Sequence, residues 1–173
     1  MSQYTVFELK PDAIVRGISR AIRADIVAYY DIVSEREVVI DRDTVLSLRE
    51  GEWQTKWAVY PNEKQREFCV ANEEGDAVVM LCKIRISEDA IKFGKRLRGR
   101  NPIPQLCESD SIRGKYADST ISLEIERGVG FICDSTGRRT GFMPNIIHTV
   151  DNEEELKEHV QVYFADIDLE RLR

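Results

Sequence analysis

Residues 77–86 form the segment that most restricts how this chain can fold. They make an apolar run with four consecutive large side chains, Val78, Val79, Met80 and Leu81. A strand with one solvated face alternates apolar and polar residues, whereas a strand covered on both faces is apolar throughout. The run therefore predicts a central strand in a sheet that other elements cover on both sides.

Shorter patterns around this strand alternate between strand and helix. Residues 4–9 alternate and are rich in β-forming side chains, and residues 32–40 return to a strand pattern. Helices are expected over residues 19–30, after a cap at Asp41 or Asp43, over 61–72, from Ser87 to about residue 97, and from Asp151 to residue 164. This order predicts one α+β domain over residues 1–173, with a mostly antiparallel sheet, helices packed on it and a C-terminal tail at 165–173.

A different pattern occupies residues 117–143. Residues 120–125 alternate, Gly128 and Gly130 interrupt the chain, residues 131–133 are apolar, and residues 134–137 have the composition of a turn. Two strand patterns joined by a turn are typical of a β-hairpin. The segment is therefore predicted to be an inserted β-hairpin or small β-meander.

The overall charge and the cysteines exclude several classes of protein. A formal net charge of −6 argues against a general nucleic-acid binder, although it allows a local cationic pocket for a nucleotide. No apolar stretch approaches membrane-spanning length, so no membrane partner is expected. The four cysteines are widely spaced without a CxxC pair, which predicts no zinc site and favours a reduced, cytoplasmic setting.

One of only two histidines, His148, ends a short β-type run, Asn145-Ile146-Ile147-His148. A neutral imidazole nitrogen is a competent nucleophile near neutral pH. A histidine on a rigid strand, with cationic side chains nearby, is therefore a candidate phosphoryl carrier. The simpler alternative is a half-buried histidine that only forms hydrogen bonds.

Cationic side chains occur in three further places. Lys10 ends the first strand, Arg113 closes an irregular loop, and a basic helix carries Lys92, Lys95, Arg96, Arg98 and Arg100. Phosphoryl transfer depends on positioning and charge neutralisation, which such residues supply. No GxxxxGK[ST] sequence is present, so a P-loop is excluded. Taken singly, each residue has an alternative as an exposed charge, for example Arg113 paired with Asp110 or Asp118.

Four motifs follow one another along residues 4–164: KPDAIVRG at 10–17, NP at 101–102, SIRGKY at 111–116 and NIIH at 145–148. In these motifs and their order the chain resembles nucleoside diphosphate kinases. The resemblance implies a ferredoxin-like βαββαβ core and a ping-pong reaction. A nucleoside triphosphate would give its γ-phosphoryl group to the histidine, and a nucleoside diphosphate would take it back.

The resemblance also implies roles for individual residues. His148 and Lys10 would be catalytic, with His148 carrying the phosphoryl group. Nucleotide contacts would come from Lys10, Phe68, Lys95, Arg100, Arg113 and Asn145. Mg²⁺ would bridge the phosphates without a protein ligand, the partners would be ATP or GTP and nucleoside diphosphates, and the chain would form a homo-hexamer or homo-tetramer.

The chain departs from the family at two positions near the histidine. Val150 stands where the family has a serine, and His159 stands where a glutamate on the last helix orients the imidazole. Glu155 lies one turn before His159 and could partner it, which would give a chain His148–His159–Glu155. Two alternatives follow: a catalytically weak or inactive nucleotide-binding module on the same fold, or an interaction protein whose insertion docks a partner.

Overall fold

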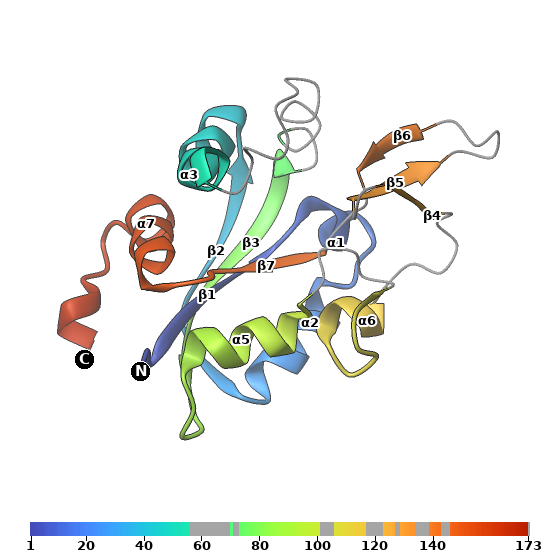
Figure 1. Cartoon of the computed structure of the whole chain (residues 1–173). Helices are drawn as coiled ribbons and strands as arrows, with labels where there is room; N and C mark the ends of the chain where they lie inside the picture. The colour runs from blue at the N-terminus through green and yellow to red at the C-terminus, as the bar shows by residue number, and fades with distance from the viewer. Residues whose placement is uncertain are drawn as a thin grey trace.

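The structure is a computed structural model that describes residues 1–55, 70, 73–100, 106–116, 123–126, 129–133, 139–142 and 146–172. Its centre is an antiparallel sheet of four strands in the order β2-β3-β1-β7 (Figure 1). The strands are β1 (Tyr4–Leu9), β2 (Tyr30–Ile40), β3 (Gly75–Ile84) and β7 (Ile147–Thr149). The apolar run forms β3, an inner strand, as its composition predicts. The order and direction of the strands are those of a ferredoxin-like α+β fold.

Helices cover both faces of this sheet (Figure 1). On one face lie α2 (Ser19–Val27), α5 (Ala90–Arg98) and α6 (Ile112–Tyr116), and on the other lie α3 (Arg42–Thr55) and α7 (Glu153–Tyr163). Two short elements complete the described helices, α1 (Pro11–Val15) and the 3-10 helix η3 (Leu169–Leu172). None of the described helices has the length and apolarity needed to span a membrane.

Strand β1 divides the buried apolar side chains between two clusters. Tyr4 and Val6 pack with residues of α3 and α7, whereas Phe7 and Leu9 pack with residues of α2, α5 and α6. This division follows from the pleat, because successive side chains of a strand point to opposite faces. Continuing the alternation, Glu8 lies on the same face as Tyr4 and Val6, toward α3 and α7.

Helix α7 begins one residue later than the sequence predicts. Asn152, not Asp151, caps the helix, and its Oδ1 accepts hydrogen bonds from the N–H groups of Glu154 and Glu155 at 2.9 Å each. Similarly Asp89, not Ser87, caps α5 by accepting from the Lys92 N–H. In both cases the extended residue directly before the helix takes the cap, as the geometry of capping requires. The expected helix over 61–72 lies almost wholly outside the described residues.

Between α6 and β7 the chain forms a second, separate sheet. Its strands are β4 (Leu123–Glu126), β5 (Val129–Cys133) and β6 (Arg139–Phe142), paired antiparallel in the order β4-β5-β6. The insertion therefore has a third strand beyond a two-stranded hairpin and is a β-meander, the second of the two predicted forms. The third strand follows the turn composition at 134–137 but contains Gly141, which weakens the strand pattern in the sequence.

Candidate functional site

The candidate site is built on β7, a short strand at the edge of the four-stranded sheet. In its pairing with β1, His148 stands opposite Glu8, and the Lys10 N–H donates to the Ile146 carbonyl at 2.9 Å. Because directly opposite residues share a face, the His148 side chain points with Glu8 toward α7. Pairing with a central strand gives this histidine the rigid position that its motif predicts.

Two buried arginines hold the backbone of β7 on either side of His148. The Arg113 guanidinium donates from Nη2 to the Ile147 carbonyl at 2.9 Å, and Arg98 donates from Nη1 to the Thr149 carbonyl at 2.8 Å. Hydrogen bonds from a charged donor are stronger than those between neutral groups. The two arginines, from α6 and α5, thus fix the edge strand that carries the candidate nucleophile. Arg98 is a member of the site that the sequence did not single out.

Directly before β7, Ile146 has a left-handed backbone with φ 64°. A β-branched residue adopts this conformation only at a cost on the order of 1–3 kcal/mol. Its two backbone groups are held, since its carbonyl accepts from the Lys10 N–H and its N–H donates to Asp12 Oδ2 at 3.1 Å. Burial raises the pKa of the Asp12 carboxyl. Asp12, which the sequence left without a role, therefore helps to hold the strained entry into β7.

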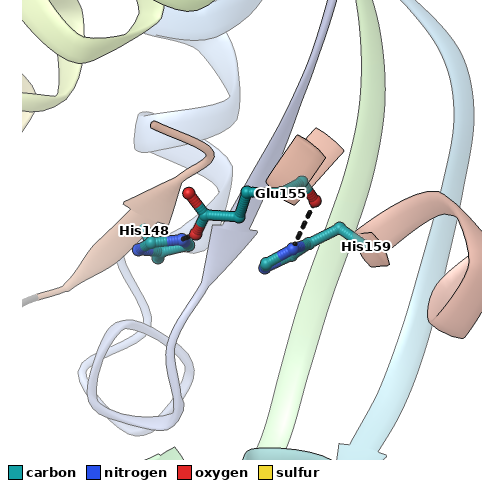
Figure 2. A group of neighbouring side chains, drawn as sticks. All are labelled: His148, Glu155 and His159. Carbon is teal, nitrogen blue, oxygen red and sulfur yellow. Dashed lines mark hydrogen bonds and ion pairs between the residues drawn. The ribbon is translucent and has the colours of Figure 1, made fainter. Parts of the chain in front are cut away.

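Three buried side chains from β7 and α7 meet beside this strand: His148, Glu155 and His159 (Figure 2). Glu155 Oε1 lies 2.8 Å from His148 Nε2, and its Oε2 accepts from the Asp151 N–H at 2.6 Å. His159 Nδ1 lies 2.9 Å from the Glu155 carbonyl oxygen, and the two imidazole rings stack with centroids 5.5 Å apart. The order differs from the expected chain, because the hydrogen bond of His148 goes to Glu155 and not to His159, which only stacks on it.

The cap of α7 explains this difference. With Asn152 as N-cap, Glu155 occupies the third helical position, from which a carboxylate turns back toward the chain before the helix. The hydrogen bonds also assign the tautomers, because carbonyl and ionised carboxylate oxygens only accept. His148 thus carries its proton on Nε2, which leaves the lone pair on Nδ1. His159 carries its proton on Nδ1, which leaves the lone pair on Nε2.

Lys10 lies in a buried acidic environment. Its Nζ is 2.7 Å from a carboxylate oxygen of Glu73 and 4.0 Å from one of Glu8, and the Tyr163 hydroxyl donates to Glu8 at 3.4 Å. Glu8, Glu73 and Tyr163 belong to none of the four motifs and were not predicted to be site residues. The available signal was the row Tyr4, Val6, Glu8, Lys10, in which a carboxylate and an amine continue the buried face of β1.

The remaining predicted residues lie farther out or outside the described residues. Lys95, on α5, is partly exposed and lies 3.2 Å from the Asp151 carboxylate. Arg100 is exposed beyond the end of α5. Phe68 and Asn145 lie outside the described residues. The structure thus gathers Lys10, Arg113, His148, Glu155 and His159 around β7 but does not bring Arg100 among them.

Solved structures with the same arrangement of strands and helices are nucleoside diphosphate kinases. The enzyme from Encephalitozoon cuniculi is 22% identical in sequence and has a TM-score of 0.63. The alignment covers 93% of this chain and 88% of that enzyme's chain. That from Borrelia burgdorferi, a transition-state mimic with bound vanadate and ADP, is 17% identical with coverages of 94% and 86% and a TM-score of 0.66. A family protein from Babesia bovis is 18% identical, with coverages of 96% and 90% and a TM-score of 0.63.

The chain has the nucleoside diphosphate kinase fold. No protein-family model matches the sequence, and no curated protein is significantly similar to it. The likeness is therefore one of fold, carried over nearly the whole chain at identities of 17–22%. On this nucleoside diphosphate kinase fold, Val150 is fully buried in the apolar cluster between the sheet and α7, so that position supplies no hydroxyl to His148.

Proposed function

We propose that this protein is a phosphotransferase of the nucleoside diphosphate kinase type, which carries a phosphoryl group on His148. The observation that supports this proposal best is the 2.8 Å contact between His148 Nε2 and Glu155 Oε1. It holds the imidazole in the tautomer whose Nδ1 has the lone pair, so the nucleophile needs no prior loss of a proton. It also puts a negative charge where positive charge would develop.

The reaction consists of two displacements at phosphorus. In the first, His148 Nδ1 attacks the γ-phosphorus of a Mg²⁺-bound nucleoside triphosphate, the bond to the bridging oxygen breaks, and the nucleoside diphosphate leaves with the bonding electrons. The phosphorylated ring then carries a positive charge, which the Glu155 carboxylate stabilises through the Nε2 proton. In the second, a terminal oxygen of another nucleoside diphosphate attacks the phosphorus, the bond from phosphorus to Nδ1 breaks, and the electron pair returns to neutral His148.

The cations around β7 would neutralise the phosphates. Arg113 and Lys10 are both buried and contact the chain next to His148, since Arg113 donates to the Ile147 carbonyl and the Lys10 N–H donates to the Ile146 carbonyl. The Lys10 ammonium lies 2.7 Å from Glu73, and its three N–H donors allow it to bind a phosphate oxygen beside this carboxylate or in its place. The negative charge of Glu73 should weaken the binding of the nucleotide in either case.

A second candidate function is a nucleotide-binding module with little turnover. It is favoured by the ion pair between Lys10 and Glu73, by the low exposure of His148, and by buried Val150 at the family's serine position. In such a protein the pocket would bind nucleotides, but the phosphoryl group would not reach the imidazole. The two candidates differ in one observable, the covalent phosphorylation of His148.

Incubation with a γ-labelled nucleoside triphosphate and Mg²⁺ separates them. The proposal expects label on the protein that is stable to alkali and labile to acid, and that is absent from His148→Asn. A nucleoside diphosphate added later should remove the label as a nucleoside triphosphate. Binding of a fluorescent nucleotide to both proteins is the control for folding. Intact nucleotide binding without label in the unsubstituted protein would establish the binding module instead.

A further inference from the structure

His148, Glu155 and His159 have the arrangement of a set of metal ligands, in addition to the hydrogen bonds between them. Each offers one ligand atom, and these atoms all lie within 4.8 Å of one another. The three side chains are 6%, 7% and 0% exposed. We propose that they bind one divalent transition-metal ion, for which Zn²⁺ is the best match.

The chemistry of the ligand set favours zinc over the magnesium that accompanies nucleotides. Two imidazole nitrogens and one carboxylate oxygen suit Zn²⁺ and related ions, whereas Mg²⁺ prefers oxygen ligands and retains several waters. Zinc sites with three protein ligands leave a fourth position for water. With zinc–ligand bonds of about 2.0–2.2 Å, ligand atoms lie roughly 3–3.5 Å apart. The side chains therefore need shifts of up to about 1 Å, in which the 2.8 Å contact between His148 Nε2 and Glu155 Oε1 opens and wider separations close onto the ion.

The surroundings already orient two of the three ligands for this role. The His159 Nδ1–H donates to the Glu155 carbonyl, so its lone pair is on Nε2 and its ring orientation is fixed. Metal-binding histidines commonly donate a hydrogen bond of this kind from the other ring nitrogen to a carbonyl oxygen. Glu155 Oε2 is bound by the Asp151 N–H, which directs Oε1 toward His148.

The elements that carry the ligands are rigid with respect to one another. Glu155 and His159 are four residues apart on α7 and therefore lie on one face of the helix. His148 is paired to β1, and the Asn152 cap fixes the first turn of α7 beside it. Charge is also balanced, because Glu73 lies closest to Lys10 and offsets its charge, so buried Glu8 and Glu155 together offset the two positive charges of the ion.

Metal binding and the proposed phosphotransfer would compete, a consequence that rests on the proposed function. The ion binds the neutral imidazole at His148 Nε2, so the single ring proton moves to Nδ1 and is not released. Nδ1 then has a proton in place of its lone pair, and Glu155 no longer accepts from Nε2–H. Both changes weaken Nδ1 as a nucleophile, so zinc occupancy should inhibit phosphorylation of His148.

Titration calorimetry of chelator-treated protein with ZnCl₂ alone, without nucleotide, tests the site. The expected result is one ion per chain and, from buffers of different ionisation enthalpy, no proton released by the two neutral histidines. His159→Gln and His148→Gln should each weaken zinc binding at least tenfold, while Glu154→Gln, a neighbouring exposed carboxylate on α7, should not. MgCl₂ should not compete. Cobalt absorption without thiolate bands would exclude the cysteines as ligands.

Unchanged zinc affinity in both histidine variants would overturn the proposal, as would no binding by the unsubstituted protein. Should His159→Gln fail to fold, a rise in the melting temperature of the unsubstituted protein with ZnCl₂, absent in His148→Gln, provides the same comparison. The experiment also separates the two proposals. Zinc binding without histidine phosphorylation would refute only the proposed function, and phosphorylation without zinc binding would refute only the metal site.

Discussion

Glu155 is the residue on which the chemistry of His148 depends most. Its carboxylate lies 2.8 Å from Nε2 and is itself held by the Asp151 N–H. Glu155→Gln keeps the shape of the side chain but removes the charge that stabilises the phosphorylated ring. We expect the single-turnover rate of His148 phosphorylation to fall about 100-fold, with nucleotide affinity changed less than about twofold. An unchanged rate would mean that Glu155 has no part in the transfer step.

Asp12 provides a prediction about stability and pH. Its carboxylate accepts the N–H of strained Ile146, and burial raises its pKa above the ordinary 3.8. The folded protein therefore binds this proton more tightly than the unfolded chain, and stability falls as pH rises from about 3.8 through the folded pKa. Asp12→Asn keeps an acceptor without titrating. Its stability relative to the unsubstituted protein should rise across that pH window.

Urea unfolding at a series of pH values measures this difference. Asp12→Ala is the matched comparison, because it also does not titrate but leaves a buried N–H without its acceptor, which should cost about 1–3 kcal/mol relative to Asp12→Asn at every pH. Parallel pH profiles for the unsubstituted protein and Asp12→Asn would contradict a raised pKa.

Single residues also show where inference from the sequence stops. His148, Lys10 and Arg113 could be selected because their motifs are local and ordered, and the structure gathers them around β7. The hydrogen-bond partner of His148 could not be predicted, since it depends on which residue caps α7. A shift of the cap by one residue brings Glu155 to the position that faces the imidazole. Glu8 and Glu73 were missed because burial of a carboxylate beside Lys10 is a tertiary property.

Two arginines donate hydrogen bonds to carbonyl groups of strand β7, and we expect them to differ in function. Arg98→Met and Arg113→Met each remove a charged hydrogen bond to a β7 carbonyl, so each should lower stability by about 1.5–3 kcal/mol. Only Arg113 is also a proposed phosphate contact. Nucleotide affinity, measured at a temperature where both variants are folded, should fall in Arg113→Met and remain in Arg98→Met. Equal losses of affinity would indicate that both act only through the strand.

Regular elements were more predictable than their ends and connections. The continuous apolar run identified β3 as an inner strand, because only coverage on both faces suits such a sequence. Residues 4–9 match β1 at both ends, since Lys10-Pro11 stops the strand. The insertion was harder, because β6 is four residues long with a glycine inside, and so short a pattern does not distinguish a hairpin from a meander.

For the assembled protein, the expected homo-tetramer or homo-hexamer remains a prediction, as does a cytoplasmic location. Light scattering coupled to size-exclusion chromatography should give four or six times the 19.9 kDa of one chain. Deletion of residues 119–143 tests whether the β-meander is an interface between subunits or a docking surface for another partner. A changed number of chains per particle would show that the β-meander is a subunit interface, whereas an unchanged number with intact phosphorylation would favour a docking surface for another partner. A monomer before deletion would contradict the expectation itself.

The atom of His148 that carries phosphate is the most direct evidence on the proposed function. Phosphorus NMR of protein phosphorylated by a nucleoside triphosphate and kept at alkaline pH distinguishes phosphate on Nδ1 from phosphate on Nε2. Because Nε2 is bound to Glu155 at 2.8 Å, we expect one signal, from Nδ1-phosphohistidine, that disappears in His148→Asn and on addition of a nucleoside diphosphate. A signal from Nε2, or none from protein that binds the nucleotide, would contradict the proposed chemistry.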